Sequence, residues 1–159
     1  MEKLLKVLED NATLTPAEIA TMLEKEEGDI KKMIAELEAS GVILGYRTVI
    51  DWDKTSSECT TALIEVKVMP QRDDGFDKIA ERIQSYPEIT ALYLMSGGFD
   101  FAVIIEGKTM KEVAYFVARK LSTLEAVTAT ATHFVLKKYK DHGKIYKSPE
   151  KDPRDHLIL

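Results

Sequence analysis

The chain has 159 residues, of which 45% are hydrophobic and 31% are charged, a composition typical of a folded globular protein and unlike that of a disordered chain. Its apolar runs are shorter than the roughly 20 residues that a membrane span needs, and no export signal opens it, so we expect a cytoplasmic protein. The formal net charge of −5 lies wholly in residues 1–51, which hold 6 basic and 11 acidic residues, and this counts against nucleic-acid binding there.

The first half of an N-terminal domain, residues 1–50, is predicted to contain two short helices. Apolar side chains from Leu4 to Leu8 indicate a helix that ends near Asn11. The run Thr15-Pro16-Ala17-Glu18 combines a capping box with a proline in the first turn. It therefore predicts that a second helix begins at this point.

A third helix and a wing complete this domain. Residues 30–37 place apolar side chains at the i, i+3, i+4 and i+7 positions, which predicts a helix of about a dozen residues. Gly41 is expected to end that helix. Residues 42–46 and 48–50 are predicted to be two short strands, so that the whole is typical of a winged helix-turn-helix.

Residues 51–59 are polar and are predicted to be a linker to a second domain over residues 60–139. In that domain, apolar and polar residues alternate as in strands, and two helical stripes interrupt them. The predicted strands are 61–69, 89–95, 101–106 and 127–138, and the predicted helices lie at 76–83 and 110–121. The order β-α-β-β-α-β predicts an α+β fold of the ferredoxin-like kind.

The Gly97-Gly98 pair stands between two apolar, strand-like runs and is followed by one acid, Asp100. Glycine accepts the positive φ that tight hairpin turns need, so a hairpin is predicted here. Turn amides can hold a carboxylate, and Asp100 can pair with an amine. The alternative, that Gly97 and Gly98 only make a turn which Asp100 caps, stays open at this stage.

The predicted sheet has one face without helices. The run from Phe101 to Ile105 is apolar on both sides, which predicts that this open face is covered. We therefore expect a homodimer formed sheet to sheet. Residues 140–159 are charged and contain proline, and we expect them to be a mobile tail.

Four motifs carry a resemblance to the Lrp/AsnC family of leucine-responsive, or feast-famine, regulators. They are residues 37–46 (Leu-Glu-Ala-Ser-Gly-Val-Ile-Leu-Gly-Tyr), 96–101 (Ser-Gly-Gly-Phe-Asp-Phe), 121–124 (Leu-Ser-Thr-Leu) and 127–137. The resemblance covers residues 1–138. It implies dimers that assemble further to tetramers or octamers, promoter DNA bound by the helix-turn-helix, and an amino acid or similar effector held between dimers.

The resemblance also implies the residues that do this work. Lys31, Lys32 and Arg47 would contact DNA. Effector binding would fall to residues around the glycine turn and on the last strand, namely Met95, Ser96, Gly97, Gly98, Asp100, Thr130 and Thr132. Neither a cofactor nor a metal is expected.

The predicted reading helix departs from the family. Family members usually carry several arginines there, whereas this chain has Glu26, Glu27 and Asp29 beside Lys31 and Lys32. These carboxylates would repel DNA, so the sequence predicts weak affinity or avidity gained through oligomerisation.

Two other functions are weighed against the regulator. A siroheme-decarboxylase-like enzyme on the same fold would need ionisable residues in a cavity. His133, His142 and His156 form no pair at ligand spacing. The single cysteine, Cys59, has no catalytic partner in the sequence. A DNA-independent ligand-binding module is supported by the charge of −5 in the first 51 residues. We therefore expect a non-enzymatic regulator.

Overall fold

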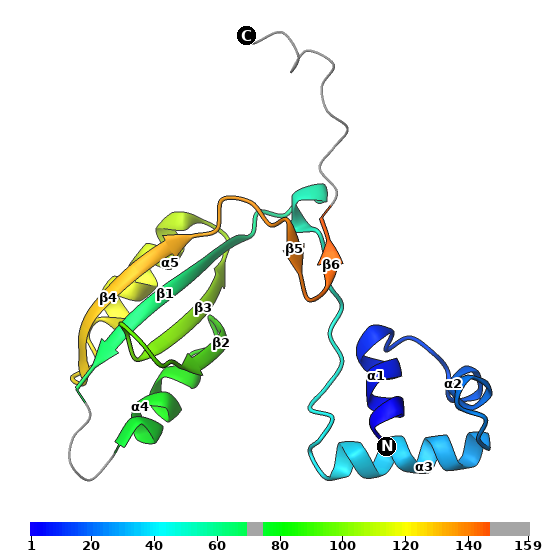
Figure 1. The fold of residues 1–159 in the computed structure, drawn as a ribbon. Coiled ribbons are helices and arrows are strands. Elements are labelled where there is room, and N and C mark those ends of the chain that lie inside the picture. The colour runs from blue at the N-terminus through cyan, green and yellow to red at the C-terminus, as the bar shows by residue number, and fades with distance from the viewer. Residues whose placement is uncertain (70–74, 147–159) are drawn as a thin grey trace, which may run out of the picture. The chain divides into compact units, whose positions relative to one another are not determined.

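The computed structural model describes residues 1–69 and 75–146 and divides the chain into two compact units. Unit 1 is Met1–Thr48, and unit 2 begins at Val49. Figure 1 shows that unit 1 is helical and that unit 2 contains the sheet. Each unit has a hydrophobic cluster of its own.

Unit 1 consists of three helices, α1 (Glu2–Asp10), α2 (Pro16–Leu23) and α3 (Glu27–Ala39). The predicted capping box is present, because the Thr15 amide donates to Glu18 Oε2 at 2.7 Å and the Glu18 amide donates to Thr15 Oγ1 at 3.3 Å. The three helices bury a shared core of Leu4, Leu8, Ile19, Ala20, Ile30 and Leu37. The sequence-based helices are thus confirmed.

The predicted strands of the wing are wrong for this chain, because residues 42–50 have no strand geometry. The apolar residues of this segment largely lie in solvent: Leu44 is 94% exposed and Val42 is 55% exposed. A strand needs a neighbour for its backbone groups. The described residues supply none to this segment.

Unit 2 has the predicted β-α-β-β-α-β order, preceded by a short 3-10 helix in the linker and followed by a small hairpin. Its elements are η1 (Trp52–Lys54), β1 (Thr60–Val68), α4 (Gly75–Gln84), β2 (Ile89–Leu94), β3 (Phe101–Gly107), α5 (Met110–Phe116), the π-helical turn η2 (Val117–Leu121), β4 (Val127–Phe134), β5 (Lys140–Asp141) and β6 (Lys144–Ile145). The four long strands pair antiparallel in the order β2-β3-β1-β4. This is the ferredoxin-like topology.

Strand β4 ends at Phe134, four residues before the predicted end. Phe134 pairs with Ala62, and the Val135 amide makes a last bond to the Thr61 carbonyl. Because β1 begins at Thr60, β4 has no further partner.

One face of the sheet carries the core. Alternate residues of β1, from Ala62 to Val66, are fully buried and pack with Ile83 of α4 and Val113 of α5 in one cluster. Both helices therefore lie on this face, and Figure 1 draws α5 behind the sheet. The register places Ile104, Ala102 and Tyr93 on the opposite, open face.

Residues after β4 differ from the prediction of a mobile tail. Residues 140–145 form the two-stranded hairpin β5–β6, with His142 (φ 43°) and Gly143 (φ 76°) at its turn. Two successive positive φ angles are typical of a type I′ turn, which matches the twist of a hairpin and favours glycine. Residues 147–159 lie outside the described residues.

Candidate functional site

The glycine turn between β2 and β3 closes at one end of the sheet. The Met95 amide donates to the Asp100 carbonyl at 2.8 Å, and the Asp100 amide donates to the Val66 carbonyl at 3.0 Å. Gly97 has φ +139°, a backbone conformation that favours glycine. Met95, Ser96, Gly97 and Gly98 are all exposed beside this closure. The structure thus groups five of the seven predicted effector residues.

Asp100 is half-buried at this end of the sheet and has a structural task. Its Oδ2 accepts a hydrogen bond from the Val68 amide at 2.8 Å. The β1–β3 ladder ends where Val66 pairs with Phe101, so the Val68 amide lies beyond the ladder and the Asp100 carboxylate accepts it instead. Val68 is the one described residue that donates to this carboxylate. The carboxylate thus bonds the end of β1 rather than the glycine turn, and an effector would have to share it.

Thr130 and Thr132 are less close to the turn than predicted. They pair with Val66 and Ile64 across β1. Strand β1 separates them from β3, so Thr130 and Asp100 have backbones roughly 10 Å apart at the usual strand spacing. Thr130 Oγ1 lies 3.2 Å from Ser122 Oγ. In a single copy of the chain, Thr132 is not part of the glycine-turn site.

Sequence reasoning missed two exposed apolar side chains at this end. Met69, the residue after Val68, is 70% exposed, and its amide donates to the Ala126 carbonyl. Leu94 is 58% exposed at the end of β2. Met95, at the start of the glycine turn, is 42% exposed as well. The sequence carried no signal for this, because a strand-end methionine usually packs inward.

The predicted DNA contacts lie on exposed surface of unit 1. Lys31 Nζ is 2.6 Å from Glu27 Oε1, one turn earlier on α3, so its charge is already compensated. Lys32 is exposed on the same helix, and Arg47 is exposed beyond its end. A phosphate at Lys31 would compete with Glu27.

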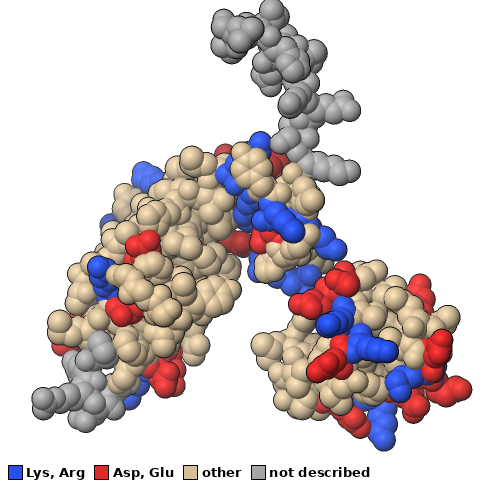
Figure 2. Space-filling model, in the orientation of Figure 1, with Lys and Arg blue, Asp and Glu red and all other residues tan. Residues whose placement is uncertain are grey.

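The turn between α2 and α3 is acidic. A shallow hollow there is lined by Glu24, Glu26, Glu27 and Asp29, with Lys25 as its one cation. Carboxylates at the N-terminal end of α3 stabilise the helix through its dipole, but they repel phosphates. Figure 2 shows acidic and basic side chains interspersed over this unit.

Two further ionisable groups report on local packing. The Tyr46 hydroxyl donates to Glu38 Oε1 at 2.9 Å, and burial together with this carboxylate raises the pKa of Tyr46. Burial also raises the pKa of Cys59, which keeps the thiol protonated and unreactive. Cys59 lines a cavity of about 50 Å³ beside the linker, far below the roughly 300 Å³ of a small ligand pocket.

The structure describes two of the three histidines, and each lies near one carboxylate. His133 Nε2 lies 3.3 Å from Glu65 on the open face, and His142 Nε2 lies 3.6 Å from Asp141 on the hairpin. His156 lies outside the described residues. Within residues 1–69 and 75–146, no three metal-ligating side chains gather, and no helix there is both long and apolar enough to cross a bilayer.

Comparisons with known proteins agree with this geometry. A family model of the Lrp/AsnC ligand binding domain matches residues 61–145. An HTH-type transcriptional regulator of Bacillus subtilis, YugG, is 44% identical over 96% of this chain and 92% of its own length. The regulator FL11 of Pyrococcus horikoshii is 29% identical over 88% and 89%, respectively.

Solved structures show the same fold. A transcriptional regulator of Neisseria meningitidis in complex with L-Met has a TM-score of 0.70 at 22% identity, covering 98% of this chain and 96% of that one. AsnC of E. coli has a TM-score of 0.65 at 18% identity, covering 85% and 89%.

Proposed function

The chain belongs to the Lrp/AsnC family, and on this premise we propose that it is a transcriptional regulator that binds promoter DNA through unit 1 and responds to an amino acid or similar small molecule. The observation that carries the proposal is the 44% identity to an HTH-type regulator across both units. The named relatives are regulators, which supports a non-enzymatic role. A single reduced cysteine supports a cytoplasmic location.

Lys31, Lys32 and Arg47 are the proposed phosphate contacts. A Lys31→Glu/Lys32→Glu variant should lose binding to the duplex upstream of the protein's own gene. A matched variant, Lys108→Glu/Lys111→Glu, makes the same charge change on exposed positions of unit 2 and should keep it. Equal binding by wild type and the α3 variant would contradict the role of α3.

The proposed effector site is the glycine turn with Asp100. Turn amides would bind the effector carboxylate, and Asp100 would bind its amine. Because the Neisseria meningitidis structure holds L-Met, and because Met69, Leu94 and Met95 are exposed here, apolar amino acids come first in the test. Calorimetric titration with single amino acids should give a saturable signal, and an Asp100→Asn variant should bind the same amino acid more weakly.

A homodimer through the open sheet face is proposed as the basic assembly, with tetramers or octamers built from it. Its support is the exposure of Tyr93, 56%, beside Ile104 and Ala102 on a face without helices. Light scattering at micromolar concentration should give twice the monomer mass or a multiple of it, whereas a monomer mass would contradict the proposal.

A DNA-independent ligand-binding module is the second candidate. Its support is the acidic hollow between α2 and α3 and the Lys31–Glu27 ion pair. Titrations with duplex DNA and with effector distinguish the regulator from the ligand-binding module, because the module would bind effector but no duplex, even at low salt.

A further inference from the structure

The strongest local concentration of positive charge in unit 2 is the hairpin at its end. We call residues 137–145 the cationic hairpin, since they hold Lys137, Lys138, Lys140 and Lys144 against one acid, Asp141. Figure 2 shows basic side chains gathered where Figure 1 draws β5 and β6. This contrasts with unit 1, where acids outnumber bases.

Two of these lysines are uncompensated. Asp141 Oδ2 lies 4.0 Å from Lys138 Nζ, and Lys137 Nζ lies 5.0 Å from the centre of the Tyr139 ring. Within the described part of the chain, Lys140 and Lys144 make no ion pair. An exposed cation without a carboxylate is ready to bind a phosphate.

The form of the hairpin suits a nucleic-acid groove. In its register Lys140 opposes Ile145 and Lys144 opposes Asp141, so the two lysines stand on opposite faces of a narrow two-stranded ribbon, and Lys144 shares its face with Asp141. The major groove of DNA admits such a ribbon. One cation would then lie near each wall of phosphates.

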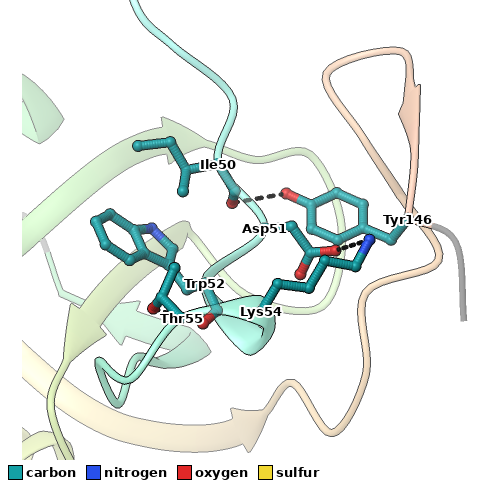
Figure 3. Close-up of polar contacts among 6 residues, drawn as sticks. All are labelled: Ile50, Asp51, Trp52, Lys54, Thr55 and Tyr146. Carbon is teal, nitrogen blue, oxygen red and sulfur yellow. Dashed lines mark hydrogen bonds and ion pairs between the residues drawn. The ribbon is translucent and has the colours of Figure 1, made fainter. Parts of the chain in front are cut away.

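The hairpin is fixed to the segment that leads out of unit 1. The Tyr146 amide donates to the Tyr139 carbonyl at 3.0 Å and closes the base of the hairpin, while the Tyr146 hydroxyl donates to the Ile50 carbonyl at 3.4 Å. Figure 3 shows Tyr146 directed at Ile50. Ile50 is two residues past Thr48, the end of unit 1, a span of about 7 Å of extended chain.

The segment after Ile50 is itself held in one conformation, which gives the hairpin a firm base. Thr55 Oγ1 donates to the Trp52 carbonyl at 2.8 Å, and Lys54 Nζ pairs with Asp51 at 3.0 Å (Figure 3). Lys140 and Lys144 are thus carried on a hairpin that is bonded to the first residues of unit 2.

We propose that the cationic hairpin is a second contact for double-stranded DNA, in which Lys140 and Lys144 bind phosphates in addition to those that unit 1 contacts. This rests on the proposed DNA-binding function and deepens it. Non-specific affinity for DNA comes mainly from phosphate neutralisation, and unit 1 has a net negative charge with Lys31 already paired. The hairpin supplies charge that unit 1 lacks.

The test compares the salt dependence of DNA binding in the full-length protein and a Lys140→Ala/Lys144→Ala variant. Two lost phosphate contacts should reduce the slope of log K against log salt by about 1.8 for each bound protomer. The affinity deficit of the variant should therefore shrink by roughly tenfold between about 50 and 200 mM salt. The loss should be equal on the promoter duplex and on an unrelated duplex, because phosphates carry no sequence.

Controls separate this inference from its premise. Lys140→Arg/Lys144→Arg should keep the wild-type slope, and Lys108→Ala/Lys111→Ala should keep it too. If wild type binds and the Lys31→Glu/Lys32→Glu variant does not, but Lys140→Ala/Lys144→Ala has the wild-type slope, the hairpin contact is refuted and the regulator stands. A wild type that binds no duplex refutes both. A changed oligomeric mass of the hairpin variant with an unchanged slope would assign the hairpin to a protein contact and overturn the proposal.

Discussion

Asp100 can be tested so that its two roles separate. The Val68 amide already donates to its Oδ2 at 2.8 Å, and the proposed effector amine would use the same carboxylate. Asparagine keeps an acceptor oxygen for Val68 but removes the negative charge. Alanine removes both. The pair of variants therefore distinguishes a structural acceptor from an ion-pair partner.

The expected magnitudes follow from this bond. A hydrogen bond to a charged group stabilises a protein by about 1.5–3 kcal/mol. Because Asp100 is only half-buried, we take the lower end of this range, and Asp100→Ala should lower the free energy of unfolding by about 1.5 kcal/mol. Asp100→Asn should lose less than about 1 kcal/mol, because a neutral bond remains. Both variants should lose effector affinity by roughly ten- to a hundredfold, which corresponds to one charged bond.

The assay is urea unfolding followed by circular dichroism, together with calorimetric titration of the effector. Asp100→Asn should be nearly as stable as wild type and yet bind effector poorly. An asparagine variant that binds effector normally would refute the ion-pair role. An alanine variant with wild-type stability would refute the structural role of the Val68 bond.

Three further variants test the packing of both units. Thr15→Ala removes the capping box of α2 and should lower the free energy of unfolding of unit 1 by about 1 kcal/mol, measured as loss of helical signal in urea. The hydrogen bond from Lys120 lowers the pKa of Glu88, so its stabilisation is present above the ordinary pKa of the carboxyl and is lost as pH falls through the lowered value. Glu88→Gln should therefore cost under about 1 kcal/mol at pH 7 for this partly exposed pair, and the unfolding curves of variant and wild type should converge once the pH lies below the lowered pKa. Ile104→Glu, opposite Leu63 on the open face, should convert a dimer to monomers in light scattering, and an unchanged mass would exclude this face as the interface.

Elements set by local sequence could be predicted well. The capping box at Thr15 fixes where α2 begins, and apolar periodicity fixes α3 and the alternating strands. The β-α-β-β-α-β order followed from those periods, and the register then decides that Thr132 is far from the glycine turn. Register depends on which residues pair across β1, which no local pattern specifies. The assignment of Thr132 to an effector site between dimers therefore stays a prediction.

The hairpin β5–β6 was missed for a different reason. Its strands are two residues each and rich in lysine, so they show no apolar alternation. The signal that was available is His142-Gly143, since glycine at a tight turn favours a hairpin. Charge alone does not make a segment disordered when its turn is well specified.

The wing segment shows how a failed prediction can still inform. Val42, Leu44, Tyr46 and Ile50 alternate as strand residues do, and each is more than 40% exposed. Exposing these side chains costs about 25 cal/mol for each Å² of apolar surface left in water. The open face of the sheet has the same property, with Tyr93 exposed beside Ile104. Both surfaces have the composition of buried ones, and the proposed dimer predicts that the open face of the sheet is covered by a second copy.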